Sequence, residues 1–241
     1  MADTAEYEIR TETTTTTVAD DGTSLPLYVA RPDRPGPHAG VIVIQEIFGV
    51  NAHIRDVTNR FARAGYTAVA PVIFHRTDPT FEGSYTDHQA AMPHAQALTP
   101  ESLSADLRAA YAWLTSPDLG QATAVASVGY CLGGRTSFLA ATVTPLTAAV
   151  SYYGGRMALE RAGDVACPML FFWGGKDKGI PLEQVRATED AMVAAGKPYT
   201  SVVFSEAEHG FFCDARAAYN PDAARQAWAH TLAFLASHIG A

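Results

Sequence analysis

Residues 129–134 read Gly-Tyr-Cys-Leu-Gly-Gly, and this short stretch decides the fold of the chain. It follows the apolar run Ala124-Val125-Ala126-Ser127-Val128 and precedes residues 134–142, which are expected to form a helix. A strand, a tight turn and a helix therefore follow one another, with a cysteine at the turn. The glycines at positions 129 and 133 leave room where larger side chains would collide across the turn.

This order is that of the nucleophile elbow of an α/β-hydrolase, with cysteine at the position that serine usually occupies. The N-terminus of the following helix would point at the sulfur of Cys131, where it favours both a thiolate and an oxyanion. The alternative is an inert cysteine buried in a strand–helix turn. The residues that accompany the turn decide between the two interpretations.

Composition restricts the class of protein and its partners. A chain of 241 residues with 48% hydrophobic residues fits one globular α/β domain spanning residues 1–241. The net charge of −8 and the lack of a basic run argue against nucleic acid or a membrane surface as partner. Residues 1–18 are polar and have no apolar signal-peptide core, so they are expected to form a poorly ordered extension. Three cysteines without metal-type pairing indicate reduced thiols in a cytoplasmic protein.

Short apolar runs alternate with amphipathic stretches along the chain. This alternation predicts an α/β fold with a mostly parallel central sheet and helices on both faces. Residues 72–100 show no clear periodicity and are expected to form a long irregular segment with a functional or mobile role. The expected strands are 25–30, 40–45, 67–70, 124–130, 147–152, 169–174 and 199–204, and the expected helices are 54–64, 100–114, 134–142, 182–195 and 220–238.

Two further polar residues follow strands on the C-terminal side of the turn. Asp177 comes after strand 169–174, and His209 comes after strand 199–204. The chain order of cysteine, aspartate and histidine is the nucleophile, acid and base order of α/β-hydrolases. An imidazole can accept the proton of a thiol whose pKa is ordinarily about 8.5, and a carboxylate can orient that imidazole. The backbone N–H groups of Leu132 and Ile47 are expected to form the oxyanion hole.

Four segments carry a resemblance to a known family. They are V-I-V-I-Q-E-I-F-G-V-N-A-H-I-R-D at 41–56, G-Y-C-L-G-G at 129–134, G-G-x-D at 174–177 and H-G-F at 209–211. These segments resemble the dienelactone hydrolase (carboxymethylenebutenolidase-like) family, and the resemblance covers about residues 20–238.

The resemblance implies hydrolysis of a lactone or ester through an acyl-cysteine. Cys131 would be the nucleophile, His209 the general base and acid, and Asp177 the residue that orients the imidazole. The acid that matches Glu46 contacts the resting thiol in the family, is displaced by substrate and then helps to remove the thiol proton.

The sequence departs from the family pattern around the substrate. Family members that open anionic lactones hold the carboxylate with arginines, one at the position of Cys213 and one in the segment that matches 85–92. Arg216 could act from a displaced position, and His88 or His94 could line the pocket, although histidine cannot copy the two-pronged fit of arginine. Arg135 is expected to be structural. The candidate substrate-binding residues are Phe48, Tyr85, His88, Phe211, Cys213 and Arg216.

The sequence therefore predicts a hydrolase that acts on a small lactone or a short ester and needs no cofactor. The spacing of His75, His88 and His94 matches no standard metal motif, so no metal is expected. One alternative is a general short-chain esterase without a preference for lactones. Another is a non-catalytic protein that binds small molecules on the same fold, against which the complete triad argues. The oligomeric state stays open.

Overall fold

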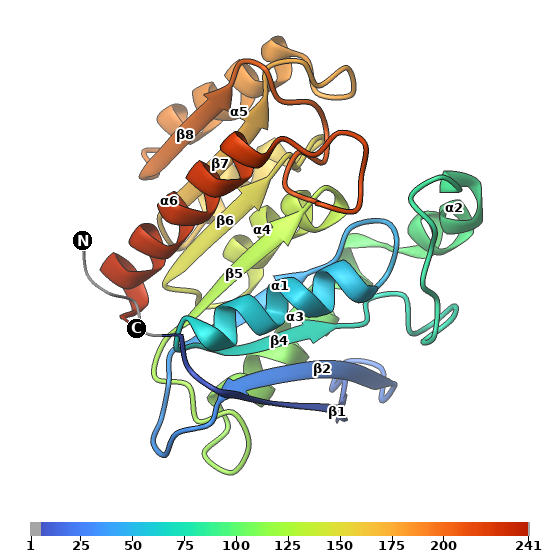
Figure 1. Cartoon of the computed structure of the whole chain (residues 1–241), viewed down its shortest axis with the longest axis vertical. Coiled ribbons are helices and arrows are strands. Elements are labelled where there is room, and N and C mark those ends of the chain that lie inside the picture. The colour runs from blue at the N-terminus through green and yellow to red at the C-terminus, as the bar shows by residue number, and fades with distance from the viewer. Residues whose placement is uncertain (1–5, 241) are drawn as a thin grey trace.

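An eight-stranded sheet runs through the centre of the molecule in the computed structural model, which describes residues 6–240 (Figure 1). The strand order is β1-β2-β4-β3-β5-β6-β7-β8. Neighbouring strands from β4 to β8 pair in parallel, whereas β2 pairs antiparallel with β4 and β1 pairs antiparallel with β2. The strands are β1 (Ile9–Thr17), β2 (Ser24–Pro32), β3 (Gly40–Ile44), β4 (Thr67–Pro71), β5 (Val125–Tyr130), β6 (Ala148–Tyr152), β7 (Met169–Gly174) and β8 (Tyr199–Phe204).

Helices cover both faces of this sheet. Figure 1 shows α1 and α6 over one face and α3, α4 and α5 over the other. The central strands β3 to β7 are buried along their whole length, which explains their continuous apolar sequences. The α/β-hydrolase fold expected from the sequence is confirmed. The helices are α1 (Ala52–Arg63), α2 (His88–Ala97), α3 (Pro100–Thr115), α4 (Leu132–Val143), α5 (Leu182–Ala194) and α6 (Pro221–Ile239), with a 3-10 helix at Leu159–Asp164.

Local sequence signals start several of these helices. Thr99 caps α3 by accepting from the backbone N–H of Ser102 at 3.1 Å, and Pro100 occupies the first helical position. Asn51 and Asn220 cap α1 and α6 in the same way. Within residues 6–240, no helix combines the length and the apolar character that a membrane crossing requires.

The prediction of a poorly ordered extension over residues 1–18 is wrong for residues 9–17, which form the edge strand β1. This strand pairs with β2 over its full length, from Ile9 opposite Pro32 to Thr17 opposite Ser24. Its run of β-branched threonines suits a polar edge strand. What stabilises β1 is its pairing with β2, which lies in another segment of the chain. The polar sequence of β1 does not show this pairing, and taken alone it suggested disorder. Residues 1–5 of the predicted extension lie outside the described residues.

The segment 72–100, expected to be irregular, contains the helix α2. Only Ala91 of this helix is buried and Pro93 lies inside it, so the segment lacks the apolar periodicity by which a helix is recognised in a sequence. Asp87 nevertheless caps it by accepting from the backbone N–H of Ala90 at 3.1 Å.

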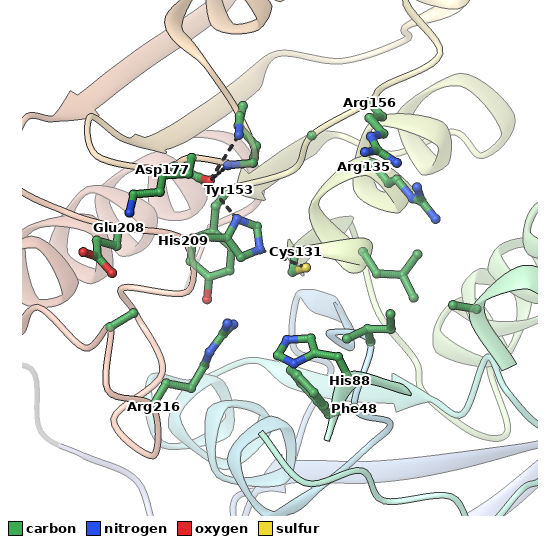
Figure 2. Close-up of a pocket in the computed structure, with 18 of the residues that line it drawn as sticks. Phe48, His88, Cys131, Arg135, Tyr153, Arg156, Asp177, Glu208, His209 and Arg216 are labelled. Atoms are coloured by element: carbon green, nitrogen blue, oxygen red, sulfur yellow. Dashed lines mark hydrogen bonds and ion pairs between the residues drawn. The ribbon is translucent and has the colours of Figure 1, made fainter. Parts of the chain in front are cut away.

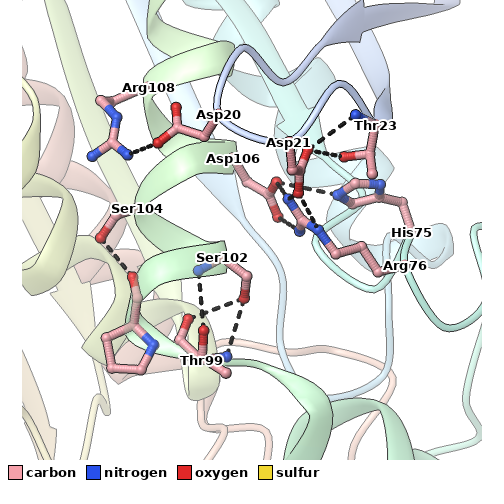
Figure 3. A network of polar contacts seen from close by, with 11 residues as sticks. Asp20, Asp21, Thr23, His75, Arg76, Thr99, Ser102, Ser104, Asp106 and Arg108 are labelled. Atoms are coloured by element: carbon pink, nitrogen blue, oxygen red, sulfur yellow. Dashed lines mark hydrogen bonds and ion pairs between the residues drawn. The ribbon is translucent and has the colours of Figure 1, made fainter.

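A buried polar network attaches the start of this segment to α3 (Figure 3). Asp106 of α3 is fully buried and accepts a hydrogen bond from Arg76 at 2.9 Å, while His75 Nε2 lies 3.1 Å from its other oxygen. Arg76 also pairs with Asp21, in the turn before β2, at 2.8 Å. The network therefore fixes His75 and Arg76, at the start of the segment that carries α2, against α3.

The turn between β5 and α4 is formed by an unusually close approach of backbone atoms. Cys131 has φ 54° and ψ −112°, in the left-handed region that costs about 1–3 kcal/mol for a residue other than glycine. A Cβ atom on Gly129 would lie 1.8 Å from the carbonyl oxygen of Gly133. A Cβ atom on Gly133 would lie 2.1 Å from the carbonyl oxygen of Ile44. Both positions therefore require glycine.

We expect the substitution Gly133→Ala to reduce the free energy of unfolding by about 3 kcal/mol, because the new methyl group overlaps the backbone at the end of β3. Urea unfolding followed by circular dichroism measures the change. Gly163→Ala is the matched control, since a Cβ atom there meets nothing within 4 Å, and a change within about 0.5 kcal/mol is expected. Equal unfolding midpoints for the two variants would contradict the steric argument.

Candidate active site

A cavity of about 570 Å³ opens at the carboxyl ends of the parallel strands. It is lined by Cys131, Asp177 and His209 together with residues from the loop after β3, including Ile47 and Phe48 (Figure 2). Open parallel sheets bind ligands at this end of the strands, because the connecting loops diverge there. The cavity thus lies where the strand-end residues of the sequence were expected to meet.

The cysteine, histidine and aspartate predicted from the sequence form one line of hydrogen bonds. Cys131 Sγ lies 3.1 Å from His209 Nε2, and His209 Nδ1 lies 2.7 Å from Asp177 Oδ2. The other oxygen of Asp177 accepts from the backbone N–H groups of Gly179 at 2.8 Å and Ile180 at 3.1 Å. The carboxylate is therefore held in place, and it can orient the imidazole toward the sulfur.

The surroundings of His209 favour its protonated form. Burial by itself would lower the pKa of the imidazole, but the hydrogen bonds to Asp177 and Cys131 outweigh it and raise that pKa to about 10. An imidazole in this position can hold a proton that leaves the thiol.

Two backbone N–H groups are available beside the sulfur. Leu132 is the first residue of α4, and Ile47 lies in the loop after β3; both line the cavity. Within the described part of the chain, neither N–H has a hydrogen-bond acceptor. The contact of Gly133 with the end of β3 brings these two segments together. An oxyanion hole requires two donors of this kind, so the assignment of Leu132 and Ile47 to it stays a prediction.

Glu46 is fully buried next to this line of residues. Its Oε1 accepts from Arg216 at 3.1 Å, whereas Oε2 has no hydrogen-bond partner within residues 6–240. Burial raises the pKa of Glu46, although the charges of Arg216 and His209 oppose that rise. The resemblance implies a contact between Glu46 and the resting thiol. In this structure the thiol of Cys131 contacts His209 instead, and Glu46 pairs with Arg216.

The candidate substrate-binding residues divide into two groups. Phe48, His88 and Arg216 line the cavity. The other three do not; they are Tyr85, which is half-buried, and the fully buried Phe211 and Cys213.

Each of these three residues contacts neighbouring side chains or is packed among them. Phe211 is fully buried, with its ring 5.3 Å from that of Tyr153. Cys213 is also fully buried, and burial raises the pKa of its thiol to about 11. The ring of Tyr85 lies 4.8 Å from that of Phe48, and its hydroxyl accepts from Asn51 at 2.9 Å.

The cavity also contains residues that sequence reasoning did not assign to it. Tyr153 and Arg156 follow β6, and Arg135, which was expected to be structural, lies in the first turn of α4. Applying the strand-end rule to β6 would have identified the first two. The two lysines at positions 176 and 178 also belong to this group.

One group of side chains outside the cavity has donor atoms suitable for a metal. The ligand atoms of His53, Cys213 and Asp214 lie within 4.8 Å of one another. Burial lowers the pKa of His53 to about 4, so its ring is neutral, but Asp214 is already paired with Arg60 at 3.2 Å. The three loop histidines considered in the sequence contact separate residues, with His75 near Asp106, His88 against Phe48 and His94 near Thr77.

Comparisons with known proteins identify relatives of this chain. The family model described as "Dienelactone hydrolase family" matches residues 25–239. A "Putative carboxymethylenebutenolidase" of Synechocystis sp. is 34% identical over 229 residues, which cover 90% of this chain and 93% of that protein. A protein of the same name from Azospirillum brasilense is 36% identical over 233 residues, covering 92% and 96% of the two chains.

A solved structure resembles the whole chain. The crystal structure named "Putative Dienelactone Hydrolase" from Klebsiella pneumoniae superposes with a TM-score of 0.84 at 32% identity, and the match covers 95% of this chain and 100% of that chain. The family match spans residues 25–239, and the structural match covers 95% of the chain. This chain therefore belongs to the dienelactone hydrolase family.

Proposed function

We propose that this protein hydrolyses a small lactone or a short carboxylic ester through an acyl-cysteine at Cys131. The observation that carries the proposal is the line of hydrogen bonds from Cys131 through His209 to Asp177 inside the cavity. Such a line supplies a nucleophile, a base and an orienting carboxylate, which are the groups that acyl transfer requires. The names of the relatives point to the same class of reaction.

In the first half of the reaction, Cys131 Sγ attacks the carbonyl carbon as a thiolate, and the proton that it has lost is held on His209 Nε2. The negative charge that forms on the carbonyl oxygen is stabilised by the N–H groups of Ile47 and Leu132. The carbon–oxygen bond of the ester then breaks, and the departing oxygen takes the proton from His209. An acyl-cysteine remains, and in a lactone the departing alcohol stays attached to the acyl group.

In the second half, a water molecule attacks the acyl carbon while His209 accepts one of its protons. The carbon–sulfur bond breaks, the carboxylic acid product leaves, and the proton returns to the sulfur. Asp177 keeps the imidazole oriented through both halves. We propose that Glu46 controls the proton on the thiol: its negative charge disfavours a thiolate until substrate binding changes its surroundings.

Two other functions fit the fold. A general short-chain esterase would use the same residues without a preference for lactones, and a non-catalytic binding protein would use only the cavity. Comparing kcat/KM for neutral esters, neutral lactones and carboxylate-bearing lactones separates them. Faster turnover of lactones supports the proposal, equal turnover of neutral esters indicates the general esterase, and no turnover indicates the binding protein.

The substitution Cys131→Ala should lower kcat/KM for p-nitrophenyl acetate by at least about a thousandfold, since no other group can form the acyl intermediate. Cys167→Ala is the control, because Cys167 is buried away from the cavity. Circular dichroism checks that both variants are folded. Activity of Cys131→Ala within tenfold of the parent protein would rule out the cysteine mechanism.

Replacing Asp177 by asparagine should lower the pKa of His209. The carboxylate hydrogen bond raises this pKa, and its removal leaves only the contact with Cys131 to oppose burial, which lowers it. The imidazolium would then lose its proton at a pH below about 10, as followed by NMR titration of the His209 ring. Asp190→Asn removes an exposed carboxylate from α5 and should leave the titration unchanged. If both variants titrate like the parent protein, Asp177 does not hold the proton on His209.

The variant Glu46→Gln tests the proposed control of the thiol. Removing a buried negative charge should favour the thiolate, so the rate of alkylation by iodoacetamide should rise several-fold at pH 7 and its pH profile should move to lower pH. Glu208→Gln removes a carboxylate from the exposed rim of the same cavity and should have a smaller effect, because solvent screens that charge. Identical profiles for the parent and Glu46→Gln would exclude the control.

A further inference from the structure

Among the charged side chains that line the cavity, positive ones outnumber negative ones, although the chain carries a net charge of −8. The only carboxylates among its lining residues are Asp177, which holds His209, and Glu208. The lining cations are Arg135, Arg156, Lys176, Lys178 and Arg216. An acidic protein with a basic cavity favours the entry of negatively charged molecules.

Three of these cations, Arg135, Arg156 and Lys178, form no ion pair with a carboxylate among residues 6–240. Arg216 pairs with Glu46, and Lys176 pairs with Glu206. By contrast, neither Arg135 nor Arg156 has an acidic group within 4 Å among residues 6–240. Two unpaired guanidinium groups are therefore available at one cavity.

The backbone places the two arginines at the same end of the cavity. A Cβ atom on Gly154 would lie 2.6 Å from the backbone nitrogen of Arg135, so the turn that carries Arg156 packs directly against the first turn of α4. Arg156 has a left-handed φ of 56°, and its N–H donates to the side chain of Gln184 at 2.7 Å. Backbone strain of this kind is found at functional sites, where it sets the direction of a side chain.

The position of His209 determines how a substrate would be oriented in the cavity. His209 must protonate the departing oxygen, so the leaving group lies on the His209 side of Cys131 and the rest of the acyl group extends the other way. Figure 2 shows Cys131 between His209 and the two arginines, with Arg216 on the opposite side of the cavity. The unpaired guanidinium groups thus lie toward the acyl part of a substrate.

We propose that Arg135 and Arg156 form a subsite that binds a carboxylate on the acyl part of the substrate, so that half-esters of short dicarboxylic acids are preferred. Guanidinium groups bind carboxylates with two parallel hydrogen bonds, and two of them from adjacent turns can hold one anion. This inference rests on the proposed function, because it names the substrate class of the same site.

The test compares two substrates that differ in one charge. Mono-p-nitrophenyl succinate carries a carboxylate on its acyl chain, and its methyl ester is the neutral counterpart. The parent protein should have the higher kcat/KM for the anionic ester. Arg135→Gln and Arg156→Gln should each lower the ratio of anionic to neutral kcat/KM by roughly tenfold, mainly through KM. The kcat/KM of the neutral ester should change less.

The matched control is Arg225→Gln, which removes the same charge from the exposed surface of α6, where Arg225 pairs with Asp222. It should leave the ratio unchanged. A ratio that falls equally in all three variants would assign the effect to net charge, and a ratio that falls in none would overturn the subsite while leaving ester hydrolysis established.

A second measurement does not depend on turnover. Iodoacetate and iodoacetamide have nearly the same shape and alkylate Cys131, but only iodoacetate is an anion. The ratio of their rates should fall in the Arg135→Gln/Arg156→Gln double variant and stay the same in Arg225→Gln. If no ester is hydrolysed, the proposed function fails, and the ratio of alkylation rates alone tests the subsite. An equal ratio in the parent protein and the double variant would then overturn the proposed subsite.

Discussion

The candidate active site depends on one contact between backbone atoms, where the first turn of α4 meets the end of β3. Gly133 has no side chain, and the carbonyl oxygen of Ile44 occupies the space that a Cβ atom would need. This approach brings the N–H of Leu132 close to the loop that holds Glu46 and Ile47. It also requires the left-handed backbone of Cys131, whose strain is compensated by the buried strands on either side.

Charge around the cysteine is arranged in three layers of decreasing burial. Glu46 is fully enclosed and pairs with Arg216, so its carboxyl group acts on the site without contact with bulk water. His209 and Asp177 form the middle layer and hold a proton beside the sulfur. The outer layer is the cavity mouth, where guanidinium groups stay unpaired. Electrostatic interactions among the buried groups of the first two layers are weakly screened. The charges of the outer layer are exposed, so water and salt screen their interactions.

Much of the fold was predictable because its signals are local or strictly periodic. The ends of β7 and β8 agree with the apolar runs at 169–174 and 199–204, and the capped start of α3 agrees with the signal at Thr99. The edge strand β1 and the helix α2 were missed. Their sequences have no apolar periodicity, because β1 is stabilised by pairing with β2 and α2 lies mostly exposed above the site.

The sequence by itself determined the residues of the candidate site: a cysteine between glycines, then an aspartate and a histidine after later strands, in an order that one parallel sheet brings together. These signals are readable because each depends on its own neighbours in the chain. Only the tertiary structure decided the pairing of Glu46 with Arg216, the burial of Phe211 and Cys213, and the position of Arg135 at the cavity. Those properties depend on how side chains from distant segments fill the space between them, which periodicity and spacing do not encode.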